Sequence, residues 1–333
     1  MVRKLKVGIM METFAKITAT AGYVPDRIVA NEELAELMDT SDDWIVAHTG
    51  IHTRHYAMNQ ENTSDLSVQV GQKLIEQAGI DAEEIDLIII STITPDSLTP
   101  STAAIVQGKL HAKNAMAFDL SAACAGFVYA MSVADKMMRS GLYRHAIVIS
   151  AEVNSKMMDF TDRTSTVFFG DGAGGALLSQ TDDAAQEFLI DEKIETDGTG
   201  ATTIHSGRVN PITHISADNF PVTDAFYQDG RSVFEFATQT VPVQMRELLS
   251  KNHLSGNDLE AVICHQANLR IIEKISDTLG FDMGKFPHTV ERFGNTSSAG
   301  IPLTLSTLEH ADKPVLLTGF GAGLAYGSIL IRM

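Results

Sequence analysis

The feature that most constrains this chain is a regular alternation of short apolar runs with amphipathic segments. Residues 86–90, DLIII, form the solid apolar run that is typical of a strand buried on both faces of a parallel sheet. The segment 64–79 before it has helical spacing, with Ser64 as the expected cap and Gly79 as the stop. The pattern continues with a helix and two strands at 100–110, 114–120 and 145–150. The sequence therefore predicts an α/β protein.

The second half of the chain repeats the first half in outline. Three pairs of segments match in the same order: DLIIISTITP (86–95) with EAVICHQANLRI (260–271), LSAACAGFVYAM (120–131) with GNTSSAGIPLTL (294–305), and FFGDGAGGALLS (168–179) with TGFGAGLAYGSILI (318–331). Matches in one order predict a duplicated α/β unit. We place the two halves at residues 1–184 and 185–333. The polar, glycine-rich stretch 196–230 is expected to be a long covering connection.

Composition and charge exclude several classes of protein. With 333 residues, 44% hydrophobic and 20% charged, the chain is neither disordered nor collagen-like nor a coiled coil. No apolar run approaches the roughly 18 residues that a membrane helix needs. A net charge of −17 argues against nucleic acid as a partner. Two cysteines cannot build a disulfide framework, so a cytoplasmic location is expected, and Met11 is a second candidate start after a ten-residue leader.

Cys124 is the first candidate for chemistry. It lies between an apolar strand and a segment that stays apolar on every side until Asp135. A helix without a polar face is buried, so Cys124 is expected near the N-terminal end of a buried helix. Unpaired N–H groups and the helix dipole at such an end favour a thiolate. The alternative is that Cys124 is only a small buried apolar residue.

Two further candidates, His265 and Asn295, lie in the second half. His265 follows the strand AVIC and is expected at its C-terminal edge, where α/β proteins gather their sites. Asn295 opens the helix that parallels the Cys124 helix. Taken singly, His265 can be a structural residue and Asn295 an N-cap. The repeat, however, puts Cys124 and Asn295 at equivalent helix starts beside His265, so we expect the three to meet at the centre of the molecule.

Two glycine-rich segments are expected to be tight turns. They are GDGAG at 170–174 and GFGAG at 319–323, and both run into strands. No Lys-Ser/Thr follows either segment, so neither a P-loop nor a dinucleotide fingerprint is indicated. Such turns can offer N–H groups to an oxyanion. The sequence has no zinc-ligand spacing, no HExxH motif and no nucleophile-elbow serine.

Three motifs in this order, DLSAACAGF, CHQANLRI and GNTSSAG, are highly specific. With them the chain resembles the β-ketoacyl-acyl-carrier-protein synthase III family of the thiolase-like superfamily. The likeness runs from SDDWIVAHTGIHTRH (41–55) through TDRTSTVFFGDGAG (161–174) to the last strand, so it covers almost the whole chain. It implies a five-layered αβαβα fold, a homodimer, and the condensation that starts type II fatty-acid synthesis.

The resemblance also implies roles for single residues. Cys124 would take an acyl group from acyl-coenzyme A, and neutral His265 and Asn295 would hold the thioester oxygen while malonyl-acyl carrier protein loses CO2. The acyl oxyanion would meet the backbone N–H groups of Cys124 and Ala322. Thiolases use a second cysteine on the last glycine-rich turn and elongating synthases use two histidines, and this chain has neither. Cys264 is expected to be inert, and no metal or cofactor is implied because acyl-coenzyme A is a substrate.

Substrate contacts are implied by the same resemblance. For coenzyme A they are Thr40, Trp44, Arg163 and Asn268, with the adenine between Trp44 and Arg163. For the carrier protein they are Gln266, Ala267, Asn268, Leu269 and Arg270. Since the carrier is acidic and the enzyme has a charge of −17, local positive potential is expected from Arg231, Arg270 and Lys274. From the residues alone, Trp44 is as readily a half-buried anchor and Arg163 a surface charge.

Thr99 matches a site that often holds phenylalanine, which reaches across the dimer to cap the acyl pocket. A smaller residue predicts a roomier pocket and acceptance of acyl primers longer than acetyl. His48 and Glu235 stand where some members have arginine and lysine, so the substrate contacts can differ in detail.

Two other functions stay open. A related condensing enzyme that makes a quinolone or polyketide would use the same scaffold. A Cys-His-Asn thioester hydrolase would use the same residue types, but it needs water at the thioester, whereas a buried helix and an oxyanion turn favour a dry tunnel.

Overall fold

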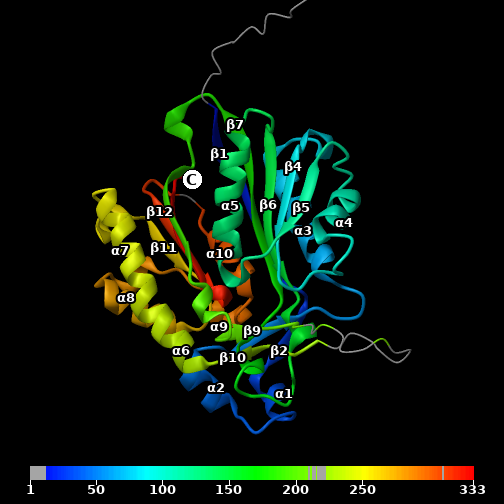
Figure 1. The fold of residues 1–333 in the computed structure, drawn as a ribbon, viewed down its shortest axis with the longest axis vertical. Coiled ribbons are helices and arrows are strands. Elements are labelled where there is room, and N and C mark those ends of the chain that lie inside the picture. Colours follow the sequence, from blue (N-terminus) through cyan, green and yellow to red (C-terminus); the bar gives the residue numbers. More distant parts are fainter. Residues whose placement is uncertain (1–12, 209–210, 212–214, 216–222, 310) are drawn as a thin grey trace, which may run out of the picture.

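Two sheets lie on either side of a central pair of helices in the computed structural model, which describes residues 13–208, 211, 215, 223–309 and 311–333 (Figure 1). The first sheet has five strands in the order β1 (Phe14–Tyr23), β7 (Gly172–Thr181), β6 (His145–Glu152), β4 (Leu87–Ser91) and β5 (Met116–Leu120). The second sheet has four, in the order β8 (Leu189–Thr196), β13 (Ala325–Ile331), β12 (Val315–Gly321) and β11 (Ala261–Cys264).

The strand directions repeat between the sheets. In the first sheet β6 runs parallel to β4 and antiparallel to β7, which is antiparallel to β1. In the second sheet β12 has the same relations to β11 and β13, and β13 is antiparallel to β8. Four strands thus repeat in order and direction, as a duplicated unit requires. The boundary at 184/185 falls between β7 and β8 and stays a prediction.

Helices occupy three layers around the two sheets. The central layer is α5 (Gly126–Met138) and α10 (Gly300–Leu305), which contact strands of both sheets. The outer face of the first sheet is covered by α3 (Thr63–Ala78) and α4 (Thr102–Lys109), and that of the second by α7 (Val241–Lys251) and α8 (Leu269–Leu279). This is the five-layered αβαβα arrangement that the resemblance implies, and the prediction is confirmed.

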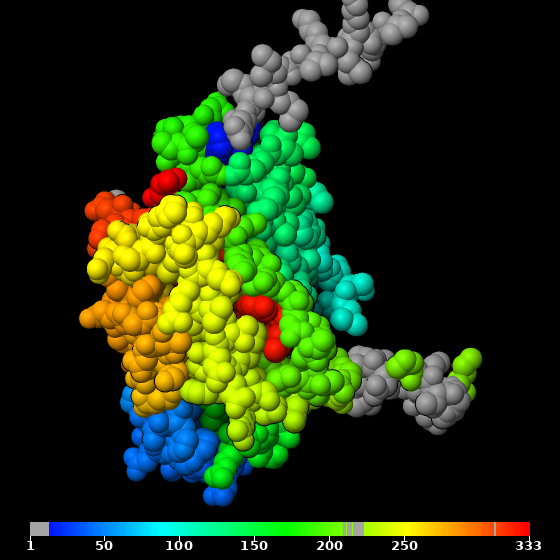
Figure 2. Space-filling model, turned by 60° about the vertical axis from the view of Figure 1, so that its left-hand side comes forward, coloured from blue at the N-terminus to red at the C-terminus, as the bar shows by residue number. Residues whose placement is uncertain are grey.

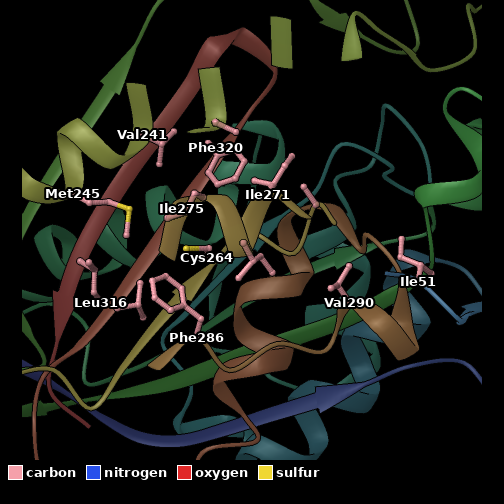
Figure 3. Close-up of a cluster of buried hydrophobic side chains, with 14 of the residues drawn as sticks. Ile51, Val241, Met245, Cys264, Ile271, Ile275, Phe286, Val290, Leu316 and Phe320 are labelled. Carbon is pink, nitrogen blue, oxygen red and sulfur yellow. The ribbon is translucent and has the colours of Figure 1, made fainter. Parts of the chain in front are cut away.

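The apolar runs explain why both faces of each sheet are covered. Side chains alternate across a strand, and in β4 the residues Leu87 and Ile89 pack toward the central helices while Ile88 and Ile90 pack toward α3 and α4. All four are fully buried. The second sheet follows the same rule. Figure 3 shows its outer cluster, with Cys264, Leu316 and Phe320 from the sheet, Val241, Met245, Ile271 and Ile275 from the helices that cover it, and Phe286 from the segment before α9.

Smaller elements gather at one end of the sheets (Figure 1). They are β2 (Arg27–Ala30), α1 (Asn31–Ala35), α2 (Asp42–Thr49), β3 (Thr53–Tyr56), β9 (Ile204–His205), β10 (Tyr227–Gln228), α6 (Gly230–Glu235) and α9 (Val290–Phe293). The long connection 196–230 contributes β9 and β10, and part of the rest of it lies outside the described residues, as do residues 1–10, for which a leader is expected. Among the residues that the structure describes, no helix is long and apolar enough to cross a bilayer.

Two local predictions need comment. The expected cap Ser64 is wrong, because Asn62 caps α3 through its side chain and the Ser64 hydroxyl instead donates to Asp96, 2.7 Å away. Gly79 ends α3 with a φ of +64°, as predicted. A π-helical turn, Phe236–Thr240, separates α6 from α7, and Pro242 lies in the first turn of α7, where a missing N–H is tolerated.

Candidate active site

Cys124 lies in the 3-10 turn Ala123–Ala125, directly before the buried helix α5, as predicted. Ala123 has a φ of +46°, a left-handed conformation that residues other than glycine seldom adopt. The turn is therefore held by its surroundings. One of these is Gly321 at the end of β12, where an added Cβ would lie 3.2 Å from Sγ of Cys124. A glycine at this position lets the strand end approach the sulfur closely.

One small cavity, of about 50 Å3, is lined by Cys124, His265 and Asn295 together with Ala322. His265 follows β11, and its backbone N–H donates to the carbonyl of Thr318 at 2.7 Å. The volume is enough for a few water molecules. The structure thus brings the three expected residues to one place from two halves of the chain.

His265 and Asn295 are both neutral hydrogen-bond donors in this cavity. Burial lowers the pKa of His265 to about 3, against a weaker opposing effect of the Ser297 backbone, so the imidazole is uncharged at neutral pH. No residue in the described part of the chain makes a well-aligned hydrogen bond to its Nδ1. The side-chain oxygen of Asn295 accepts from the Ser297 N–H at 2.8 Å. Its Nδ2 group is therefore the one left to donate.

Burial of Cys124 opposes the thiolate that the helix end is expected to favour. Burial raises the pKa of Cys124 to about 12, and the negative charge of Glu152 acts in the same direction. A contact of 3.4 Å with the hydroxyl of Ser297 lowers this pKa only in part. Desolvation is thus the largest of these effects on the pKa of Cys124.

A buried carboxylate, which the sequence reading missed, lies behind the cysteine. Glu152 ends β6, and its Oε2 accepts from the hydroxyl of Thr94 at 2.6 Å while its Oε1 accepts from that of Ser298 at 2.8 Å. Ser297 donates to the same Oε1 at 3.5 Å. The sequence did hold a clue, because Glu152 stands at the end of a buried strand, as His265 does.

A larger chamber of about 500 Å3 adjoins the small cavity. The two share five lining residues: Ile93, Ala123, Ile204, Phe226 and Ala322. The rest of the lining is mixed, with apolar Leu120, Ala122, Ala201 and Ala325 beside polar Ser121, Thr196, His205 and Ser206. Tyr129 of α5 lines the chamber, and its hydroxyl donates to the carbonyl of Glu195 at 2.7 Å. The chamber is suited to an apolar chain that extends from Cys124.

Trp44 and Arg163 lie against each other on the surface. The guanidinium carbon of Arg163 is 5.4 Å from the centroid of the Trp44 ring, and its NH1 group donates to the carbonyl of Asp39 at 2.6 Å. His48 stacks on Trp44 with ring centroids 4.3 Å apart. Thr40, nearby in sequence, has a buried hydroxyl without a hydrogen-bond partner among the described residues.

The segment expected to meet the carrier protein is divided between interior and surface. Gln266 and Ala267 are buried, and the Gln266 amide is bound to the carbonyl of Cys264 and the N–H of Thr289. The three partly exposed residues are Asn268, Leu269 and Arg270. Asn268 caps α8, because its side chain accepts from the N–H of Ile271 at 3.0 Å.

The guanidinium of Arg270 makes several contacts within the protein. Its guanidinium donates to the carbonyls of Ala47 and Val46 at the end of α2, and it pairs with Glu273 at 3.0 Å. Figure 2 shows the face where α8 (orange) lies above α2 (blue) and beside α7 (yellow). The arginine therefore ties α8 to the helix that carries Trp44.

Thr99 is exposed and does not line the cavity of its own chain. Cys264 is buried in the outer cluster of the second sheet, where burial raises its pKa to about 12. Neither residue meets Cys124 within one chain. In the described residues there is no cluster of three or more His, Cys, Asp or Glu that could hold a metal ion.

Comparisons with known proteins agree with this geometry. The 3-oxoacyl-[acyl-carrier-protein] synthase III model matches residues 118–198, and the model of its C-terminal part matches residues 249–333. The chain is 61% identical to β-ketoacyl-[acyl-carrier-protein] synthase III 1 of Lactiplantibacillus plantarum over 97% of this chain and all of that protein. It is 44% identical to the synthase III of Lactococcus lactis over 96% of this chain and all of that one.

Solved structures lead to the same group. The synthase III of Thermus thermophilus is 35% identical with a TM-score of 0.87, covering 96% of this chain and 99% of that one. The priming β-ketosynthase of the R1128 polyketide pathway is 34% identical with the same TM-score, covering 98% of each chain. From the site geometry, the family models and relatives of this identity and coverage, the chain belongs to the β-ketoacyl-acyl-carrier-protein synthase III family, with its thiolase-like fold.

Proposed function

We propose that this chain condenses an acyl-coenzyme A primer with malonyl-acyl carrier protein, giving 3-ketoacyl-acyl carrier protein, CO2 and coenzyme A. This is the step that starts type II fatty-acid synthesis. The observation that carries the proposal is the single cavity in which Cys124, His265 and Asn295 meet. It occurs in a chain that is 61% identical to a named synthase III.

In the first half-reaction Cys124 takes the acyl group. Its sulfur attacks the thioester carbon, and the oxygen becomes negatively charged. The backbone N–H groups of Cys124 and Ala322 are the proposed donors to that oxygen, because both residues line the cavity and Gly321 brings the turn against the cysteine. One oxyanion donor typically contributes about 10²–10³ in rate.

In the second half-reaction malonyl-acyl carrier protein loses CO2. Negative charge builds on its thioester oxygen, and His265 with the Nδ2 group of Asn295 donates to it. Neutral donors suit this step, because a cation would also stabilise the carboxylate that has to leave. The lowered pKa of His265 keeps it in that neutral state. The carbanion then attacks acyl-Cys124.

Coenzyme A is proposed to bind at Thr40, Trp44, Arg163 and Asn268. An adenine between Trp44 and Arg163 needs about 7 Å, which is two van der Waals contacts of about 3.5 Å. The present 5.4 Å means that Arg163 has to swing outward and release the carbonyl of Asp39. The hydroxyl of Thr40 is buried and unpartnered among the described residues, so it can meet the ligand only after the side chains over it move.

The acidic carrier is proposed to dock on the partly exposed end of the QANLR segment. Asn268, Leu269 and Arg270 form this contact, and the buried Gln266 and Ala267 position it. Arg231 and Lys274 are exposed and add positive potential. Each of Arg231 and Arg270 also pairs with a glutamate of its own helix, so the net field is weaker than the bare charges suggest.

We propose a homodimer formed at β5. This strand is at the edge of its sheet and pairs only with β4 in the described chain, and its Met116 is half exposed. An open edge strand is ready to pair with a second chain. In such a dimer Thr99 would reach the partner's acyl pocket. Together with the 500 Å3 chamber, a small residue there favours primers longer than acetyl.

The reaction needs no cofactor, because acyl-coenzyme A is a substrate, and two free cysteines suit a reducing cytoplasm. The polyketide-type alternative keeps support from the R1128 relative, at 34% identity. The hydrolase alternative stays open, because the cavity at Cys124 has room for a few water molecules, although its lining is largely apolar.

The proposal is tested by supplying acetyl-coenzyme A and malonyl-acyl carrier protein and measuring the products. Acetoacetyl-carrier protein with one CO2 for each coenzyme A released is expected. Acetate release without CO2 would indicate a hydrolase. Turnover only with a malonyl acceptor other than the carrier protein would indicate the quinolone or polyketide type.

A further inference from the structure

Glu152 is the buried titratable group that the reaction scheme above leaves unused. It is fully buried at the end of β6, and burial raises its pKa. A buried ionisable group lowers the stability of the fold unless hydrogen bonds compensate for its lost solvation, so its contacts indicate its role. They lead to Cys124 through one hydroxyl, that of Ser297.

We propose that Ser297 and Glu152 form a proton relay that takes the proton of Cys124 when the acyl group arrives and returns it when the product leaves. Sγ of Cys124 is 3.4 Å from Oγ of Ser297, and this Oγ is 3.5 Å from Oε1 of Glu152. Both contacts are long, as catalytic hydrogen bonds often are before substrate binds. The inference rests on the proposed acylation of Cys124.

The backbone at Ser297 gives independent support. Ser297 has a φ of +52°, which is unfavourable for a residue with a Cβ and costs of the order of 1 kcal/mol or more. Ala123, next to the cysteine, has the equivalent positive φ in the other half. The two turns contact each other through Sγ and Oγ. Both strained positions therefore serve the same contact.

The donors around Glu152 favour its ionised form. Backbone N–H groups can only donate, and those of Ile93 and Thr94 both point at its Oε2, each at 3.1 Å. The hydroxyl of Thr94 also donates to it, and this hydroxyl accepts from the N–H of Val153. Hydrogen bonds of this kind favour the carboxylate and oppose the effect of burial.

The charged groups that face Glu152 are few. The charge of Lys156 interacts with that of Glu152, and Asp96 and Asp171 act on Lys156 as well. Burial lowers the pKa of Lys156, whose ammonium group donates to Asn62, Thr63 and the carbonyl of Pro95. None of these groups touches Sγ of Cys124 within the described residues. Ser297 is the hydroxyl that does.

The relay balances over one turnover. The S–H proton passes to Ser297 Oγ while the proton of Ser297 passes to Glu152, and the sulfur electron pair forms the bond to the thioester carbon. The bond from that carbon to coenzyme A breaks, and the coenzyme A thiolate takes a proton from solvent. After CO2 leaves, the carbanion forms the new C–C bond, the bond from the acyl carbon to Cys124 breaks, and its thiolate recovers the proton from Glu152.

The test is the rate at which acetyl-coenzyme A acylates Cys124 in a single turnover, measured against pH. Wild-type acylation on Cys124 establishes the step itself and is separate from the test of the relay. Above the pKa of Glu152 the wild-type rate should be level. In Glu152→Gln the proton has to go to solvent, so the rate at pH 7 should fall by about 10² and rise about tenfold per pH unit. Glu152→Asp should restore part of the level profile.

Ser297 and Ser298 form a matched pair, because both hydroxyls donate to Oε1 of Glu152 and only that of Ser297 contacts the sulfur. Ser297→Ala and Ser297→Gly should both slow acylation by about 10², the glycine showing that the strained φ is not the cause. Ser298→Ala should slow it less than about threefold. The relay is overturned if the acylation rate of Glu152→Gln has the pH profile of the wild type, whatever its absolute value. It is also overturned if Ser297→Ala and Ser298→Ala slow acylation by the same factor.

Discussion

Gly321→Ala tests how closely the oxyanion turn has to approach the nucleophile. An added Cβ would lie 2.9 Å from Cβ and 3.2 Å from Sγ of Cys124, where ordinary contacts are about 3.5–4.0 Å. The turn or the cysteine therefore has to move by roughly 0.5–1 Å. Since a misplacement of about 1 Å can cost about 10² in rate, acylation by acetyl-coenzyme A should slow by that factor. Overpacking should also lower the free energy of unfolding by about 1–3 kcal/mol.

The assay is single-turnover acylation followed by mass, with thermal unfolding measured on the same samples. Gly108→Ala is the matched control, because Gly108 is exposed near the end of α4 and no heavy atom lies within 4 Å of its added Cβ. It should acylate normally and gain about 0.5–1 kcal/mol of stability. If Gly321→Ala acylates as fast as the wild type, the close approach of the turn has no part in the chemistry.

Four other predictions concern substrates and pH. Trp44→Ala removes the adenine platform and should raise the KM for acyl-coenzyme A about tenfold, with the KM for malonyl-carrier protein unchanged; equal changes in both would contradict a coenzyme A role. Arg270→Glu adds a second carboxylate beside Glu273 and should raise the KM for malonyl-carrier protein while sparing acyl transfer; equal loss in both steps would refute the docking role. The pKa of His265 is lowered to about 3, so the rate at which Cys124→Ala decarboxylates malonyl-carrier protein should be level from about pH 5 to 8. An inflection of that rate near pH 6.5 would mean a solvated imidazole. A competition assay should show primers longer than acetyl accepted, and strict preference for acetyl would contradict the roomy pocket.

The same lowered pKa also links stability to pH. His265 takes up its proton more readily in the unfolded chain than in the folded one. As the pH falls below about 6.5, the unfolded state therefore binds the proton first and the folded state loses stability.

The fold could be predicted from the sequence because its strands are buried on both faces. An apolar run such as 86–90 is easily recognised as a strand, because no solvent-facing polar residue interrupts it. The repeated order of segments in the two halves predicts that Cys124, His265 and Asn295 meet. The cap of α3 was misplaced because Asn62 and Ser64 are both good capping residues, and local sequence does not say which one is free.

The electrostatics of the site could not be predicted from the sequence in the same way. A helix end predicts a thiolate at Cys124, but the desolvation that opposes it depends on how tightly two sheets close over the turn. The contact of Ser297 with both Cys124 and Glu152 joins residues that are 145 or more positions apart. No local motif reports such a contact.

The central claim is that Cys124 carries the acyl group before decarboxylation. Mass spectrometry of the intact protein with acetyl-coenzyme A, wild type beside Cys124→Ala, tests it most directly. We predict that the wild type gains one acetyl group, mapped to the Cys124 peptide. This group should be lost when malonyl-acyl carrier protein is added and acetoacetyl-carrier protein appears. Acetylation that persists in Cys124→Ala, or no acylation with any primer, would contradict the account.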